Sequence, residues 1–241
     1  MASLAGQGAS IDSPLLRTEA KPSRVALIVV SANRGLCGGY NNNTLRLASA
    51  HRKELMDKGS EVDVFMIGKK GISLFRYLKI PVTESYTDID DNVTYDRSEE
   101  LALFFMDRFV SRYYDRVEVA SQIYYSSGSQ KPGITQLLPI GIAESAGAEK
   151  AAPQAAAGSV IYEPDPGTIA SEMLPLAVKT MFYRVLLEAA ASEQIARRIA
   201  MKNATDAAGE MVKLLTRTYN RARQASITQE ILEIVGGADA L

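Results

Sequence analysis

The sequence predicts an α/β domain that is followed by one very long C-terminal helix. Apolar, β-branched runs alternate with amphipathic segments along the first two thirds of the chain, which is typical of a largely parallel sheet covered by helices. From Thr168 to about Val235, the only proline and glycine are Pro175 and Gly209. A helix of roughly 65 residues, about 100 Å long at 1.5 Å per residue, can therefore form there, whereas an average helix has about 11 residues.

The elements of the α/β domain follow from local pattern, and they predict a Rossmann-like domain with a mostly parallel sheet. We expect strands in the apolar runs and helices in the segments with an apolar stripe. A capping box near Ser98 predicts the start of the third helix, and a proline-glycine turn is expected between the last two strands. Residues 141–158 are of low complexity and predict a mobile loop, and "SVIYEPDPG" predicts an edge strand. The expected strands are 24–31, 61–68, 80–86, 116–127 and 133–140, and the expected helices are 41–59, 69–79 and 98–114.

Three regions are expected along the chain. Residues 1–23 are small, polar and broken by glycine and proline, so they predict a linker. The α/β domain is predicted over residues 24–163, and the long helix over residues 164–241.

A glycine-rich turn, "SANRGLCGGYNNN", follows the first expected strand, at the place where an α/β enzyme holds a phosphate. The spacing of Gly35, Gly38 and Gly39 matches neither G-x-G-x-x-G nor a P-loop, and the second strand ends without an acidic residue for a ribose. We therefore expect these glycines to allow positive φ and close packing of helix on sheet. A nucleotide-binding enzyme is the rival hypothesis, and Cys37 is expected to be a small buried residue.

Composition argues against several classes of site. The chain has one cysteine and one histidine, which exclude an internal disulfide and a zinc site of the usual kind. The net charge of −1 gives no support for nucleic-acid binding. His51 is expected on a solvated helix face rather than in a catalytic triad. We find no apolar run of about 18 residues and no secretion signal, and we expect no catalytic residue, cofactor or metal.

The long helix carries an apolar seam and a basic stripe. The seam alternates by four and three residues, as in a coiled coil, and its alanines would let a partner helix approach closely. Beside it, Lys213, Arg217 and Arg221 recur every four residues and form a basic stripe. A helix about 100 Å long extends far beyond an α/β domain that is only about 30–35 Å across. We therefore expect the projecting part of the helix to need another helix as its partner. The seam consists of Ala204, Ala208, Met211, Leu215, Thr218, Ala222, Ala225, Gln229 and Leu232.

Two segments resemble the gamma subunit family of F-type ATP synthases. "RARQASITQEILEIVGGADAL" is very similar to the C-terminal signature of that family, and "SANRGLCGGYN" resembles its glycine-rich segment. "SEQIARRIAMKNATDAAGEM", "ITQLLPI" and "YEPDP" match in the expected order. The resemblance runs from about Ser10 to Leu241.

The resemblance implies a central-stalk subunit, a rotor shaft that couples transmembrane ion flow to ATP synthesis or hydrolysis in the catalytic head. It implies as partners the hexamer of alpha and beta subunits, the epsilon subunit and the membrane ring of c subunits, without nucleic acid and without direct nucleotide binding. It also implies a non-catalytic subunit that is peripheral to the cytoplasmic face of the bacterial plasma membrane. The partner-interface residues expected from the family and from the seam and stripe are Arg197, Lys213, Arg217, Arg221, Gln224, Thr228, Glu230, Ile231, Leu232 and Val235.

The family's members begin with a long helix that forms an antiparallel coiled coil with the C-terminal one. Residues 1–23 contain two prolines and would span only about 35 Å as a helix, so they cannot replace it. We therefore expect an N-terminally truncated chain whose C-terminal helix is poorly supported in isolation. The alternative function is a coiled-coil scaffold or adaptor with an α/β domain, which would not need the signature at the C-terminus.

Overall fold

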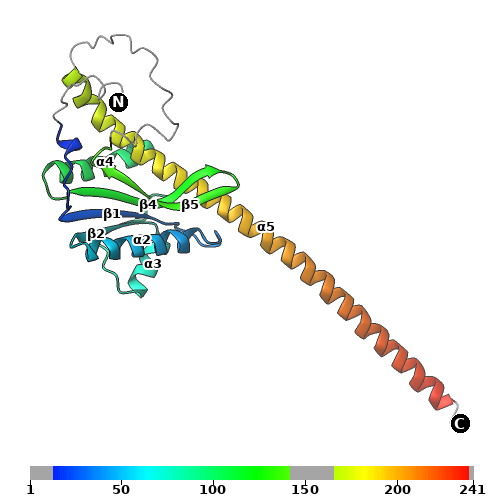
Figure 1. Cartoon of the computed structure of the whole chain (residues 1–241). Helices are drawn as coiled ribbons and strands as arrows, with labels where there is room; N and C mark the ends of the chain where they lie inside the picture. The colour runs from blue at the N-terminus through cyan, green and yellow to red at the C-terminus, as the bar shows by residue number, and fades with distance from the viewer. Residues whose placement is uncertain (1–12, 142–165, 239–241) are drawn as a thin grey trace, which may run out of the picture. The chain divides into compact units, whose positions relative to one another are not determined.

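A computed structural model describes residues 13–141 and 166–238 (Figure 1). The chain forms two compact units, Met1–Ala196 and Arg197–Leu241, and the boundary between them falls inside the last helix. The expected regions 1–23, 24–163 and 164–241 were defined by composition and residue pattern, whereas the two compact units are defined by contacts between residues. The division into three regions stays a prediction. The low-complexity segment and the strand expected in "SVIYEPDPG" lie almost wholly outside the described residues.

The first unit is built on one five-stranded sheet in the order β3-β2-β1-β4-β5. Among the described strands, the pairs β1–β2, β1–β4 and β2–β3 are parallel and β4–β5 is antiparallel, which confirms the mostly parallel sheet. The five strands expected between residues 24 and 140 are all present, although the third is short. The strands are β1 (Arg24–Val30), β2 (Glu61–Ile67), β3 (Glu84–Tyr86), β4 (Arg116–Ser126) and β5 (Ser129–Leu138).

Helices cover both faces of this sheet (Figure 1). Side chains of β1 alternate between the two faces: Ala26 and Ile28 pack with the cluster that contains α4 and α5, and Leu27 and Val29 pack with α2 and α3. All four are fully buried, which explains why β1 is an unbroken apolar run. The helical elements are a 3-10 turn (Pro14–Leu16), α2 (Tyr40–Asp57), α3 (Lys69–Tyr77), α4 (Tyr95–Val110) and α5 (Pro166–Ala238).

The long helix is confirmed, and at 73 residues it is slightly longer than predicted. It continues through Pro175, which lies near its N-terminus. The part of α5 that belongs to the first unit buries one stripe against the sheet and α4. The stripe contains Leu174, Val178, Phe182, Val185, Leu186 and Ala189.

The start of α4 and the turn after β4 differ from the prediction. Helix α4 begins at Tyr95, and Ser98 is fully buried inside it with no hydrogen-bond partner for its hydroxyl among the described residues, so it is not a cap. The turn between β4 and β5 lies at Ser127 and Gly128, whereas Pro132 lies within β5. Proline is tolerated there because β5 is an edge strand in the described part of the sheet.

His51 does not lie on a fully solvated face, as the sequence had indicated. Its Nε2 atom is 2.6 Å from Oε2 of Glu118, and the Glu118 side chain is only 6% exposed. Arg116 contacts the other carboxylate oxygen of Glu118 at 3.5 Å. His51 therefore helps to satisfy a buried carboxylate where α2 packs on β4, which a single sequence does not reveal.

Replacement of Gly68 by alanine is expected to destabilise the first unit. Gly68 has φ of 94°, and an added Cβ would lie 2.0 Å from the backbone oxygen of Ser31. We expect Gly68→Ala to lower the free energy of unfolding, measured with urea, by at least about 2 kcal/mol. Gly128→Ala is the matched control, because its nearest neighbouring atom is 4.0 Å away and its φ is not positive. Equal stability of the two variants would contradict the strain at Gly68.

Replacement of Phe182 by alanine tests whether the first part of α5 is integral to the core. Phe182 is fully buried, so we expect Phe182→Ala to cost about 3–5 kcal/mol in urea unfolding. Leu187→Ala removes an apolar side chain that is 41% exposed on the same helix, and it should cost much less. A small effect at Phe182 would show that α5 packs only loosely on the sheet.

Candidate functional site

The second unit exposes its apolar seam. Residues 201–238 are all exposed, including Met211, Leu215 and Leu232 of the seam, which are 60–66% accessible. Val212, Leu214 and Tyr219 beside the seam are equally exposed. A row of large apolar side chains along one helix is far more than the scattered exposure of an ordinary surface, so it marks an interaction site.

Seven of the ten predicted interface residues form one continuous stripe on this helix. At 100° per residue, they lie within about 40° of a single line along the helix, because they alternate by four and three. The centre of this stripe is rotated by about 110° around the helix axis from the centre of the seam, so the stripe and the seam form two distinct faces of the helix. The stripe consists of Lys213, Arg217, Arg221, Gln224, Thr228, Ile231 and Val235.

The stripe changes in chemistry along its length. Its first three members are cationic, and Ile231 and Val235 near the C-terminus are apolar and 55% and 52% exposed. Of the other predicted residues, Leu232 belongs to the seam, and Glu230 accepts a 3.4 Å hydrogen bond from Ser226. Arg197 is half-buried at the start of the unit and is not among the fully exposed residues. The assignment of all ten to a partner interface stays a prediction.

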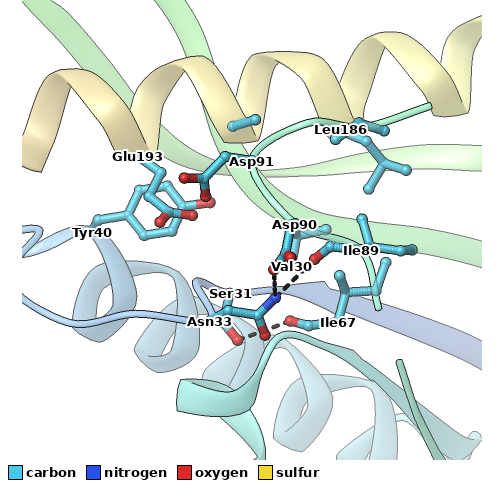
Figure 2. A pocket seen from close by; sticks show the side chains of 12 residues that line it. Val30, Ser31, Asn33, Tyr40, Ile67, Ile89, Asp90, Asp91, Leu186 and Glu193 are labelled. Carbon is cyan, nitrogen blue, oxygen red and sulfur yellow. Dashed lines mark hydrogen bonds between the residues drawn. The ribbon is translucent and has the colours of Figure 1, made fainter. Parts of the chain in front are cut away.

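A small cavity lies at the carboxyl ends of β1 and β2, on the edge of the sheet at which a Rossmann-like domain binds a nucleotide (Figure 2). It is lined by the ends of these strands, by Asp90 and Asp91, and by Leu186 and Glu193 of α5. Its volume is about 20 Å³, which is room for a water molecule, whereas small-molecule sites have on the order of 300–1,000 Å³. Helix α5 and the loop before α4 thus leave no room for a nucleotide in this cavity.

The glycine-rich turn organises this end of the sheet through its polar side chains. Asn33 donates to the backbone oxygen of Ile89 at 3.0 Å and accepts from the amide of Lys69 at 3.0 Å (Figure 2 shows the first contact). Asn41 accepts from the amide of Ala32 at 2.9 Å and donates to the sulfur of Cys37 at 3.1 Å. The turn therefore joins β1 to the segments that follow β2 and β3.

The glycines serve the turn differently from the expectation. Of the three, only Gly38 has positive φ, and the non-glycine Leu36 also adopts it, with φ of 63°. Gly39 precedes α2 directly and has φ of −82°. Cys37 is buried, as predicted, and packs with Ala32 and Tyr40.

The segment 87–91 is held from two directions. Arg97 of α4 contacts Asp88 at 2.6 Å, and this hydrogen bond holds the pKa of the Asp88 carboxyl below its usual value. On the other side, Asp91 accepts hydrogen bonds from Arg34 and from Gln194 of α5, the latter at 2.5 Å. Sequence analysis missed these residues, because they are far apart in the chain and only the fold brings them together.

Neither a metal-binding cluster nor a membrane-spanning helix occurs among the described residues. In residues 13–141 and 166–238, no group of three or more His, Cys, Asp and Glu side chains is placed to hold a metal ion. Within the same ranges, none of the helices has the length and apolar character needed to cross a membrane.

Comparison with known proteins gives consistent matches along the whole chain. A family model described as ATP synthase matches residues 1–241. The ATP synthase gamma chain of Leptospira biflexa is 49% identical over 241 residues, covering 100% of this chain and 82% of the relative. The gamma chain of Gemmatimonas aurantiaca is 42% identical over 233 residues, covering 95% of this chain and 77% of the relative.

Solved structures share the fold. A chain of the mitochondrial ATP synthase of Euglena gracilis superposes with a TM-score of 0.62 at 19% identity, covering 91% of this chain and 73% of its own. A chain from the central stalk and c-ring of the Tetrahymena thermophila enzyme gives a TM-score of 0.58 at 20% identity, covering 85% and 92%. The fold, the C-terminal signature and the identity to these relatives agree: the chain belongs to the ATP synthase gamma chain family and is a central-stalk subunit of an F-type ATP synthase.

Proposed function

We propose that this chain acts as a non-catalytic rotor shaft, which couples transmembrane ion flow to ATP synthesis or hydrolysis by turning inside the catalytic head. The observation that carries the proposal is the exposed part of α5, which has an apolar seam on one face and a cationic-to-apolar stripe on another. A helix that offered only a seam would fit a general coiled-coil adaptor. The separate stripe gives the shaft a second surface for partners.

The proposed partners are the hexamer of alpha and beta subunits, the epsilon subunit and the ring of c subunits. The Euglena structure is described as containing F1 and the c-ring, and the Tetrahymena structure as central stalk and c-ring, which supports this set. In this proposal the chain binds neither nucleotide nor nucleic acid, and the small strand-end cavity supports the first point. The subunit would be peripheral to the cytoplasmic face of the plasma membrane, since the sequence relatives are bacterial.

The coupling mechanism requires a shaft whose sides differ. A partner can shift a conformational equilibrium only by contacting its states with different free energies. As the shaft turns, a given catalytic subunit would meet the stripe and then the opposite side in succession. The seam would be covered by an antiparallel helix, as the family resemblance implies, so the stripe and the outer faces remain for the head subunits.

Charge reversal along the stripe tests the proposed interface. Replacement of Lys213, Arg217 and Arg221 by glutamate should weaken binding of the chain to the alpha–beta hexamer by roughly tenfold at low salt, because exposed ion pairs each contribute about 0.2–1 kcal/mol. The loss should shrink as ionic strength rises. Binding can be followed by surface plasmon resonance on the immobilised hexamer.

The matched control makes the same charge change on the first unit. Lys53, Lys69 and Lys131 are exposed, and their replacement by glutamate should leave binding to the hexamer unchanged. If both triple variants bind the hexamer like the unaltered chain, the stripe is not the interface. If the chain does not bind an ATPase hexamer at all, the adaptor alternative is favoured.

Hydrogen exchange tests the support of the exposed helix. In the isolated chain, amides 201–238 should exchange much faster than those of α2, because this part of α5 buries no side chain. Assembly with the hexamer and its coiled-coil partner should slow exchange along this range. Uniformly strong protection of amides 200–235 in the isolated chain would contradict the expectation.

A further inference from the structure

Two contacts hold α5 at the end of the first unit. Ala196, the last residue of that unit, packs against the cluster of Ala32, Cys37 and Tyr40. Two residues earlier, the side-chain amide of Gln194 donates to Oδ2 of Asp91 at 2.5 Å. From Arg198 onward, α5 has almost no buried surface, so both contacts lie close to the end of the buried part of the helix.

The two contacts lie on nearly opposite sides of the helix. Positions two apart on an α-helix are rotated by about 200°, which is about 160° the shorter way. Ala196 and Gln194 thus make contacts on two sides of the helix axis, and the buried Ser192 and Glu193 directly precede Gln194 in the chain. Two contacts on opposed sides add to the resistance that the packed apolar stripe already offers to rotation of the helix about its own axis.

Both contacts depend on the same glycine-rich turn. The turn supplies Ala32, Cys37 and Tyr40 directly. It also supplies Arg34, whose guanidinium donates to the same Oδ2 atom of Asp91 that receives Gln194. Positive φ at Leu36 and Gly38 brings these groups into one short turn. Hydrogen bonds to a charged carboxylate are roughly twice as strong as those between neutral groups. The bonds to Asp91 can therefore hold Gln194 in place when force is applied to the helix.

We propose that this arrangement is a torsional clamp, in which Asp91 and Gln194 are positioning residues that stop α5 from rotating relative to the α/β unit. Torque applied to the exposed part of the helix then reaches the sheet through the clamp instead of being lost as rotation of the helix. The inference rests on the proposed rotor function, since a chain that carries no torque has no need of such a clamp.

The isosteric variant Gln194→Glu tests the clamp. It places a second carboxylate beside Asp91 at an exposed position of a helix, where glutamate is a good helix former, so folding is retained. The full chain is assembled with the hexamer, the hexamer is fixed to a surface, and a bead is attached to the α/β unit. Angular fluctuation of the bead in stalled complexes gives the torsional stiffness of the rotor, and we expect Gln194→Glu to lower it by roughly 1.5-fold, because one of two opposed contacts is lost.

Two further variants separate the clamp from a purely structural role. Gln194→Lys places a cation beside Asp91 and should restore the stiffness of the unaltered chain. Gln130→Glu makes the same chemical change at an exposed glutamine that donates to Ser126 in the β4–β5 hairpin, and it should leave stiffness unchanged. The free energy of unfolding in urea, measured for each variant and for the unaltered chain, checks that a change in torsional stiffness does not come from a loss of folded structure.

The outcomes distinguish the clamp from the rotor function itself. If the unaltered chain rotates the bead and Gln194→Glu is equally stiff, the clamp is overturned while the rotor function stands. Loss of stiffness that Gln194→Lys does not restore would also overturn it, because the effect would not depend on the Asp91 contact. If the unaltered chain does not rotate with the hexamer, the proposed function fails and the clamp fails with it.

Discussion

Burial of the first part of α5 against the sheet is the interaction on which the rest of the structure depends. Phe182 and its neighbours complete the core on one face of β1, and without them the apolar side chains of α4 and the strands would face water. The same helix runs on into a stretch with no buried side chain. Helix α5 is thus continuous from a segment that packs in the core to a segment that is exposed to solvent. The change from one to the other occurs within a few residues of Ala196.

This constraint also explains why the strand-end crevice is closed. In a Rossmann-like sheet the carboxyl ends of neighbouring strands leave room for a ligand where the strand order reverses. Here the strand order reverses between β1 and β4, and at the neighbouring ends of β1 and β2 the residues Leu186 and Glu193 of α5, together with Asp90 and Asp91, leave a cavity of only about 20 Å³. A feature that in other α/β proteins accommodates a cofactor has become a place where the sheet holds its own helix.

The sequence was sufficient to predict the parallel strands and the long helix, because both follow from local periodicity and from the scarcity of glycine and proline. It failed where tertiary contacts override local signals. Ser98 looks like a helix cap, yet it is buried a full turn inside α4, and Pro132 looks like a turn residue, yet it lies in an edge strand. The seam and the cationic part of the stripe could be found from spacing alone, whereas Gln224 and Thr228 were expected from the family resemblance. The contacts of Arg34, Asp91 and Gln194 could not, since no local pattern relates three residues so distant in the chain.

Pro132 has a further consequence for the behaviour of the chain in solution. The outer edge of β5 would otherwise offer a regular row of backbone donors to any extended polypeptide, and such edges are sites of sheet-to-sheet aggregation. A proline in this strand removes one donor, and at the opposite edge β3 has only three residues. Among the described residues, both margins of the sheet are therefore poor templates for strand addition, which disfavours polymerisation of the subunit through its sheet.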